Sequence, residues 1–373
     1  MKFNRYALSD LATIKYGKNQ KKVLSDSGNI PIYGTGGLMG YATTALYDKP
    51  SVLIGRKGTI GKVKYVEHPF WTVDTLFYTI VNTDIVLPKY LYYVMSLIDL
   101  NNYNEGTTIP SLRTETLNRL EFDIPSLEEQ GTILSCLNPI DEKIALNNAI
   151  NNNLEQQAMA LFKSWFIDFE PFNRQVPKTW INGVLGDFVE IKRGGSPRPI
   201  QNFLSDSGFH WLKISDATGI SSPFINEIKE YIIEAGLKKT VYLKSGSLVL
   251  SNSATPGLPK ILDIDTCIHD GWLYFPSSKF SNEYLYLYFK HIRDNLIALG
   301  NGSVFTNLKT DILKNYPTYL PTEDVLKKFD GLVQPIFSMI LSKTREIKRL
   351  AEIRDTLLPK LMSGELDVSD IEL

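Results

Sequence analysis

The chain has 373 residues, of which 43% are hydrophobic and 22% charged, a composition that is typical of globular domains and excludes a disordered chain. At this length we expect two domains, each with a core of its own. No apolar run approaches the ~18 residues that span a bilayer, and the first residues lack the apolar stretch of a signal peptide. With only two distant cysteines, Cys136 and Cys267, we expect a cytoplasmic protein with reduced thiols and no membrane partner.

The net charge of −1 conceals an uneven distribution of charge along the chain. Residues 1–64 hold 11 Lys and Arg against 3 Asp and Glu, a net charge of +8, whereas residues 126–176 hold 3 against 7, a net charge of −4. A surface that faces nucleic-acid phosphates needs a local basic excess rather than a basic average. Uneven charge is also common on solvated surfaces, so this distribution alone does not decide between the two interpretations.

In chain order, two strand-rich segments alternate with two long helical segments. Short apolar runs bounded by Gly, Pro, Asn and Asp, such as residues 51–55 and 247–251, are typical of β-strands. One helix is expected within each strand-rich segment, at residues 88–100 and 282–299. The predicted division is a first domain at 1–125, a first helix at 126–170, a second domain at 171–320 and a second helix at 321–373.

A constant offset relates the two halves of the sequence. A shift of 196 residues superposes Thr59 on Thr255 and Asp74 on Asp270, with no gap between about residue 52 and residue 165. Nearer the N-terminus, Leu8-Ser9-Asp10 matches 185–187 at a shift of 177, so the second copy carries 19 additional residues in its early part. The sequence is therefore a tandem duplication, and the repeated unit is a strand-rich domain followed by a long helix.

The helical segments carry apolar residues at alternating steps of four and three, the spacing of a coiled-coil seam. Asn147, Asn151 and Lys343 interrupt the two seams near their middles, and polar seam residues fix register. Two equivalent seams favour pairing with each other, antiparallel under an approximate two-fold axis; the alternative is that each helix packs only on its own domain. The predicted fold class is α+β, with two mixed α/β domains with β-rich cores, separated by an antiparallel coiled coil. The seam residues are Ile133, Leu137, Ile140, Ile144, Leu154 and Leu161 in the first helix, and Val333, Ile336, Ile340, Ile347, Leu350 and Leu357 in the second.

Basic and polar turns supply the candidate binding residues. In the turn at residues 55–62, glycines allow close approach of the main chain to phosphate, and Arg and Lys can pair with phosphate or guanine. The equivalent turn at 251–258 carries amides and hydroxyls, as expected if two domains share a scaffold and recognise different bases. A plain hairpin turn would explain the glycines but not the Arg56-Lys57 pair. The candidates for DNA contact are Lys18, Lys21, Lys22, Arg56, Lys57, Thr59, Lys62, Thr107, Thr108 and Arg113 in the first copy, and Arg193, Arg198, Asn252, Ser253, Thr255, Lys260, Ser303, Asn307 and Lys309 in the second.

Three patterns that resemble catalytic motifs lack the partners that the chemistry requires. The glycine-rich stretch at 34–40 has neither the dinucleotide-binding spacing nor a following Gly-Lys-Ser/Thr, and a turn between strands explains it better. The Glu190-Ile191-Lys192 triplet lacks the upstream Pro-Asp of a metal-dependent nuclease, and Asn138-Pro139-Ile140 lacks the second proline and the aromatic residue of an amino-methyltransferase. We expect no catalytic residue, metal site or cofactor in this chain. A self-sufficient DNA nuclease or methyltransferase, or a coiled-coil adaptor with no DNA role, stay as alternatives.

The order of motifs along the whole chain resembles the specificity subunit of type I restriction–modification systems. The resemblance is carried by Leu8–Lys18, Gly55–Lys62, Ile124–Gln130, Val176–Trp180 and Leu357–Leu366. It implies two target-recognition domains that each recognise half of a split, asymmetric site in double-stranded DNA, with the helices setting the gap. It also implies docking of two methyltransferase (modification) subunits and of restriction/translocase subunits. S-adenosylmethionine, ATP and Mg²⁺ are then expected on those partners.

Overall fold

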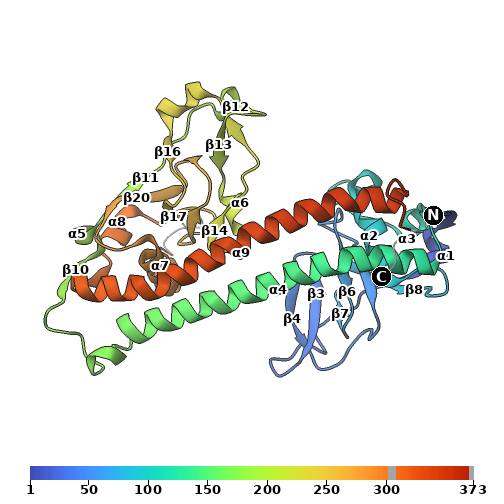
Figure 1. The fold of residues 1–373 in the computed structure, drawn as a ribbon, viewed down its shortest axis with the longest axis horizontal. Coiled ribbons are helices and arrows are strands. Elements are labelled where there is room, and N and C mark those ends of the chain that lie inside the picture. The colour runs from blue at the N-terminus through green and yellow to red at the C-terminus, as the bar shows by residue number, and fades with distance from the viewer. Residues whose placement is uncertain (301–307, 369–373) are drawn as a thin grey trace. The chain divides into compact units, whose positions relative to one another are not determined.

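The computed structural model describes residues 1–300 and 308–368, which form two compact units (Figure 1). Unit 1 comprises Met1–Glu142 with Leu350–Leu373, and unit 2 comprises Lys143–Arg349. The boundaries of both units fall inside the two long helices, α4 (Leu127–Phe166) and α9 (Glu323–Ser363). Each unit therefore contains one strand-rich domain and a part of each long helix.

Unit 1 is built on a four-stranded antiparallel sheet of strand order β2-β8-β5-β6, with a second sheet of order β4-β3-β7. The central strand β5 is buried at all five residues, as its uninterrupted Ser-Val-Leu-Ile-Gly run requires. Helix α2 begins with Pro88, whose fixed φ suits the first helical position, and buries Tyr90 and Leu91 against the core. The elements are β1 (Asn4–Ala7), α1 (Leu8–Leu11), β2 (Ala12–Tyr16), β3 (Ile30–Gly34), β4 (Gly37–Ala42), β5 (Ser51–Gly55), β6 (Val63–Val66), β7 (Trp71–Thr72), β8 (Leu76–Val81), α2 (Pro88–Ser96), η1 (Leu100–Tyr103), α3 (Thr114–Asn118) and β9 (Glu121–Ile124).

Unit 2 repeats this plan with a larger second sheet. Its first sheet has the strand order β11-β20-β17-β18-β14, and its second has the order β12-β15-β13-β19-β16. Relative to unit 1, the first sheet has β14 as a further edge strand, and the second sheet has β12 and β16 as further edge strands. The elements are η2 (Glu170–Phe172), β10 (Ile181–Val184), α5 (Leu185–Phe188), β11 (Val189–Arg193), η3 (Ile200–Asn202), β12 (Leu204–Ser205), β13 (Phe209–Leu212), α6 (Ile214–Thr218), β14 (Phe224–Ile225), β15 (Tyr231–Ile232), η4 (Glu234–Lys239), β16 (Val241–Leu243), β17 (Leu248–Ser251), β18 (Pro259–Leu262), β19 (Thr266–Ile268), β20 (Trp272–Ser278), α7 (Asn282–Gly300), α8 (Thr310–Lys314) and β21 (Pro317–Leu320).

The two long helices pack against each other and run antiparallel within unit 2. Asn151 Nδ2 donates to Thr344 Oγ1 at 3.3 Å, while Lys143 Nζ lies 3.8 Å from Glu346 Oε1, so lower numbers on α4 meet higher numbers on α9. Helix α4 begins at a capping box in which the Ser126 amide donates to Glu129 Oε2 at 2.9 Å. Both long helices lie where the periodicity predicts them, and α2 and α7 lie within about four residues of the helices expected at 88–100 and 282–299.

The predicted seam residues are all buried or half-buried. Each long helix packs both on the other long helix and on a strand-rich domain. Ile133, Leu137, Val333 and Ile340 are fully buried, and the other predicted seam residues are half-buried. Beyond residue 151, the buried positions of α4 are Glu155, Ala158, Phe162 and Phe166, so that Glu155 and Phe162 each lie one residue beyond the predicted Leu154 and Leu161. The shift arises because this part of α4 also packs on its own domain, where the Phe162 ring meets Tyr284 of α7 at 5.3 Å.

Candidate functional site

In unit 1 the basic turn at residues 55–62 lies beside the loop at 106–111. The Gly58 amide donates to the Pro110 carbonyl at 2.9 Å, and Lys57 forms a β-bridge with Ser111. Gly58 has φ +85°, a conformation that glycine adopts without strain. The structure therefore brings together two candidate segments that are about 50 residues apart in sequence.

Within this turn, Arg56 and Lys57 have different surroundings. Arg56 Nη1 donates to the Asp74 carbonyl at 2.8 Å, and its guanidinium lies 5.0 Å from the centre of the Tyr16 ring. Lys57 is exposed, as are the other predicted contacts of this face. Arg113 is 70% exposed and is paired with Glu105, with 3.1 Å between Nε and Oε2. The exposed candidates of unit 1 are Lys18, Lys21, Lys22, Lys57, Thr59, Lys62, Thr107, Thr108 and Arg113.

An apolar hairpin beside this basic turn was not among the predicted contacts. Leu38, Met39 and Tyr41 of β4 are 54%, 55% and 45% exposed, and Ile109 in the neighbouring loop is 59% exposed. A side chain built on Gly58 would meet the Thr35 hydroxyl at 4.0 Å, so the hairpin tip borders the basic turn. The glycine-rich stretch at 34–40 is the turn between β3 and β4, as predicted. The signal that could have identified the hairpin as a surface is its Leu-Met pair next to that turn.

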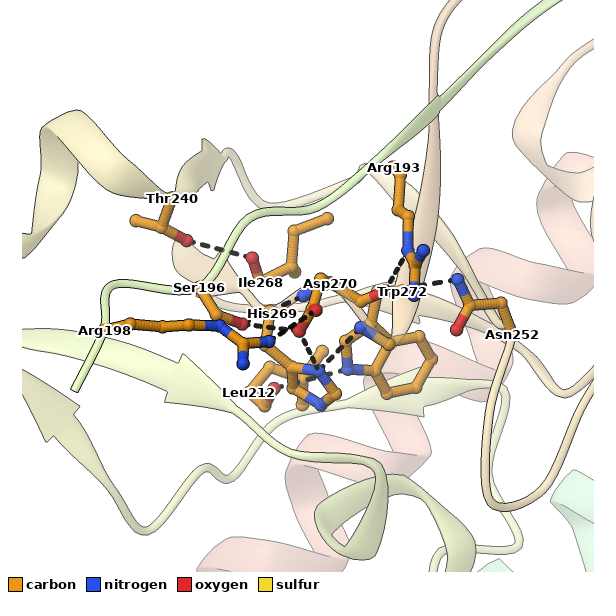
Figure 2. Close-up of polar contacts among 11 residues, drawn as sticks. Arg193, Ser196, Arg198, Leu212, Thr240, Asn252, Ile268, His269, Asp270 and Trp272 are labelled. Atoms are coloured by element: carbon orange, nitrogen blue, oxygen red, sulfur yellow. Dashed lines mark hydrogen bonds and ion pairs between the residues drawn. The ribbon is translucent and has the colours of Figure 1, made fainter. Parts of the chain in front are cut away.

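In unit 2 the corresponding face is organised around Asp270, in the turn between β19 and β20 (Figure 2). Arg193 Nε and Asn252 Nδ2 both donate to the Asp270 main-chain carbonyl, the latter at 3.2 Å. The Asp270 carboxylate accepts from Ser196 Oγ at 2.6 Å and from Arg198 Nη2 at 3.1 Å. The Ser196 hydrogen bond, together with the charges of Arg198 and Arg193, outweighs burial and lowers the pKa of Asp270.

The imidazole of His269, the neighbour of Asp270, is held in place by a main-chain hydrogen bond. Its Nδ1 accepts from the Gly271 amide at 2.7 Å, and burial lowers the pKa of the imidazole. His269 is therefore neutral at neutral pH and adds no charge to this face. Arg198, Lys213 and Glu230 line a cavity of about 780 Å³ next to it, over Trp211, in which Lys213 Nζ donates to Glu230 Oε1.

The main-chain hydrogen bonds of the two faces are equivalent. The Arg56 amide donates to Thr75 O at 2.9 Å, and its repeat equivalent, the Asn252 amide, donates to Gly271 O at 2.9 Å. The carbonyls of the same two residues accept from Leu112 at 3.0 Å and from Leu308 at 2.7 Å. The two faces are therefore one main-chain scaffold that carries different side chains.

Of the candidate contacts in the second copy, two are buried and two lie outside the residues that the structure describes. Lys260 is 2% exposed, and its ammonium donates to the carbonyls of Ile220 and Ser222 at 2.6 and 2.5 Å. Asn252 is 4% exposed. Both side chains are engaged inside the fold, so we leave them out of the proposed contact set. Ser303 and Asn307 lie outside the described residues, whereas Lys309 is exposed and Ser253 and Thr255 are half-exposed.

Within residues 1–300 and 308–368, no group of three or more His, Cys, Asp and Glu side chains is arranged to hold a metal ion. Over the same residues, no helix has the length and apolar character needed to cross a membrane. Both cysteines are free thiols, and burial raises the pKa of Cys267 to about 11. The described surface thus offers hydrogen-bonding and cationic groups in loops.

Comparison with known proteins agrees with the duplicated plan. The family model of the type I restriction modification DNA specificity domain matches the chain twice, at residues 2–156 and 177–347. A curated relative, the type I restriction enzyme MjaIX specificity subunit of Methanocaldococcus jannaschii, is 29% identical over 350 residues, with 87% of this chain and 80% of the relative covered. The type I restriction enzyme HindI specificity subunit of Haemophilus influenzae is 26% identical over 387 residues, with 82% of this chain and 84% of the relative covered.

Among solved structures, the chain is similar to the S subunit of a type I restriction–modification system from M. genitalium. The TM-score is 0.60 at 16% identity, and the similarity covers 97% of this chain and 96% of that one. At this identity the similarity concerns the fold alone. It confirms the predicted fold class of two repeated α/β domains with long helices.

Proposed function

Because this chain belongs to the family of type I restriction modification DNA specificity domains, we propose that it selects the DNA site of a type I restriction–modification complex. Each domain recognises one half of a split, asymmetric site in double-stranded DNA. The observation that carries this proposal is the equivalence of the two faces around Arg56 and Asn252, where one hydrogen-bonded scaffold presents different side chains. Shared positioning with different base contacts is what two half-sites of different sequence require.

The chain is proposed to be non-catalytic and to act within a cytoplasmic complex. Two methyltransferase subunits and the restriction/translocase subunits would bind it and would bring S-adenosylmethionine, ATP and Mg²⁺. The apparent absence of nucleophile, metal and cofactor motifs in the sequence supports this division of labour. Incubation of the purified chain with duplex DNA, S-adenosylmethionine, ATP and Mg²⁺ tests it, since cleavage or methyl transfer by the chain alone would overturn it.

Mapping modified bases across the genome of the host tests the recognition proposal. We expect one split motif whose modification disappears when the gene for this chain is deleted and returns when the gene is restored. A motif with no gap, or a motif that persists without the gene, contradicts the proposal.

A pair of repeat-equivalent variants assigns a half-site to each domain. We expect Lys57→Ala in unit 1 and Ser253→Ala in unit 2 to affect opposite halves of the motif. If Lys57→Ala reduces modification equally at every site without relaxing a base position, Lys57 contacts phosphate only. Loss of discrimination in both halves from one variant would contradict recognition by separate domains.

A further inference from the structure

Arg198 is an exposed cation of the unit 2 face whose partners hold it in place. It lies in the loop that follows β11, and its side chain is 78% exposed. Its Nη2 donates to Asp270 Oδ2 at 3.1 Å, while Ser196 Oγ donates to the other carboxylate oxygen at 2.6 Å. The Asp270 amide in turn donates to Ser196 Oγ at 3.2 Å. Figure 2 shows this closed set of contacts.

This arrangement leaves most of the guanidinium available. A guanidinium has five N–H donors, and Asp270 engages a donor on Nη2. Arg198 lines the cavity of about 780 Å³ that Lys213 and Glu230 also line. An arginine whose orientation is fixed in advance loses less conformational entropy on binding than a free one, so it can select a partner by geometry as well as by charge.

We propose that Arg198, held by Asp270 and Ser196, is the residue with which the second domain recognises a guanine of its half-site in the major groove. The proposal rests on the proposed function of the chain and deepens it. Guanine presents O6 and N7 as two adjacent acceptors, and two arginine donors match them in a bidentate pair. Asp270 and Ser196 are positioning residues that act through Arg198.

Arg193, the other predicted arginine of this face, does not have the same freedom. Its Nε donates to the main-chain carbonyl of Asp270, which the Asn252 side chain also contacts. In unit 1 this carbonyl position is Asp74, and there Arg56 supplies the hydrogen bond. Arg193 and Arg56 therefore stabilise equivalent turns, whereas Arg198 is exposed and is oriented by the Asp270 carboxylate.

At the position equivalent to Arg198, unit 1 has no such arrangement among the described residues; its carboxylate-paired arginine is Arg113, which lies beside Glu105 in a different loop. At the shift of 177, Lys21 takes the place of Arg198, and no ion pair joins Lys21 to Asp74 among the described residues. An ammonium cannot form the planar bidentate pair, so Lys21 suits a phosphate. The guanine contact should therefore affect a single half of the motif.

The test maps modified bases in the host genome after replacing the gene with variants of the full chain. Arg198→Ala is expected to relax one position of one half-site, with discrimination for guanine falling by about 10-fold to 100-fold. Arg198→Lys keeps the charge and is expected to relax the same position, because the bidentate pair is lost. Asp270→Asn should relax that position less than Arg198→Ala does. Lys279→Ala, which removes an exposed cation elsewhere in unit 2, is the matched control and should leave the motif unchanged.

The outcomes separate this proposal from the proposed function. If the half-site recognised by unit 1 is unchanged in the Arg198 variants, the chain still folds and assembles. If both Arg198 variants keep the wild-type motif, or only lower modification uniformly, Arg198 contacts phosphate and the proposal is overturned. A wild-type motif with no G·C pair in the half recognised by unit 2 also overturns it. Failure of the proposed function is distinct, since no split motif would then depend on the gene.

Discussion

At equivalent positions between the strand-rich domain and the long helices, the two copies are packed with different kinds of side chain. In unit 1, Asp141 of α4 accepts from Tyr93 Oη and from Arg354 Nη1, the latter at 3.1 Å. The shift of 196 turns Tyr93 and Asp141 into Phe289 and Phe337, and it relates Arg354 to Ala158 in unit 2. Phe289, Phe337 and Ala158 are each at most 1% exposed. One copy therefore has a hydrogen-bonded charged cluster where the other has an apolar core.

The reverse holds one helical turn further along. In unit 2, Glu155 of α4 accepts from Tyr286 and from Lys290, the latter at 2.5 Å. The equivalents in unit 1 are Ala351, Tyr90 and Val94, and the buried Tyr90 hydroxyl has no hydrogen-bond partner among the described residues. Duplication preserved the backbone plan while each copy placed its buried charge at a different position. A register that brought Asp141 against Phe289 would leave a buried carboxylate without a donor, at a cost of several kcal/mol. The clusters thus distinguish the correct helix–domain pairing from the exchanged one.

The largest effect is expected from removing Glu155, which is 8% exposed. Glu155→Ala leaves the Tyr286 hydroxyl and the Lys290 ammonium without their shared acceptor, so the free energy of unfolding of unit 2 should fall by about 3 kcal/mol. Urea unfolding followed by tryptophan fluorescence measures it, since Trp165, Trp180, Trp211 and Trp272 lie in unit 2. Glu142→Ala, at an exposed glutamate of the same helix, should change the free energy by less than about 0.5 kcal/mol. Equal effects of the two variants would show that the Glu155 cluster contributes nothing specific.

A smaller loss is expected at the corresponding cluster of unit 1. Asp141→Ala should destabilise unit 1 by about 2 kcal/mol, less than Glu155→Ala, because Asp141 and Arg354 are 23% and 26% exposed and solvent screens the pair. Installing the residues of unit 2, with Asp141→Phe, Tyr93→Phe and Arg354→Ala together, should recover most of that loss. Hydrogen exchange of the α2 amides measures both variants. If the triple variant is less stable than Asp141→Ala, the two cores are not interchangeable despite their common backbone.

Lys260 and its equivalent Lys64 differ in burial, and this predicts a difference in pH dependence. Burial lowers the pKa of Lys260 to about 8, whereas in the unfolded chain a lysine keeps its proton to about 10.5. Between pH 8 and pH 10.5 the unfolded state binds more protons than the folded state. The contribution of Lys260 to the free energy of unfolding therefore rises as the pH rises through this range. Relative to Lys260→Met, the wild-type chain should gain about 1–2 kcal/mol between pH 7 and pH 10.

Lys64→Met is the control for this titration, because Lys64 is more exposed and partial burial lowers its pKa less than that of Lys260. Its pH dependence, measured by urea unfolding at each pH, should differ from the wild type by less than that of Lys260→Met. Parallel curves for the wild type and Lys260→Met would mean that the folded chain keeps Lys260 charged through this range.

The sequence predicted what depends on periodicity and repetition, and missed what depends on tertiary contacts. The long helices follow from apolar spacing, and the duplication follows from a constant offset. The burial of Lys260 could not be predicted, because its acceptors are the carbonyls of Ile220 and Ser222, which lie 40 and 38 residues away in sequence. The hydrogen bond between Arg198 and Asp270 could not be predicted either, because Asp270 lies 72 residues away in sequence. The exposed side chains of Leu38 and Met39 were missed as a surface because the stretch at 34–40 was interpreted only as a turn between strands.

The smallest effects are expected at the turn that the two copies share. Gly58 has φ +85°, and its repeat equivalent Ala254 has φ +56°, so the fold imposes a left-handed residue at this position in both units. Such a conformation costs alanine about 1–2 kcal/mol more than glycine, and the greater freedom of glycine in the unfolded chain offsets about 0.4–1 kcal/mol of this. Ala254→Gly should therefore stabilise unit 2, and Gly58→Ala should destabilise unit 1, each by about 0.5 kcal/mol. Side-chain space does not oppose the second change, since the nearest atom to a Cβ at Gly58 is Thr35 Oγ1 at 4.0 Å. Hydrogen exchange at the two turns measures both variants, and shifts of the same sign would show that contacts outside the backbone conformation decide the stability of this turn.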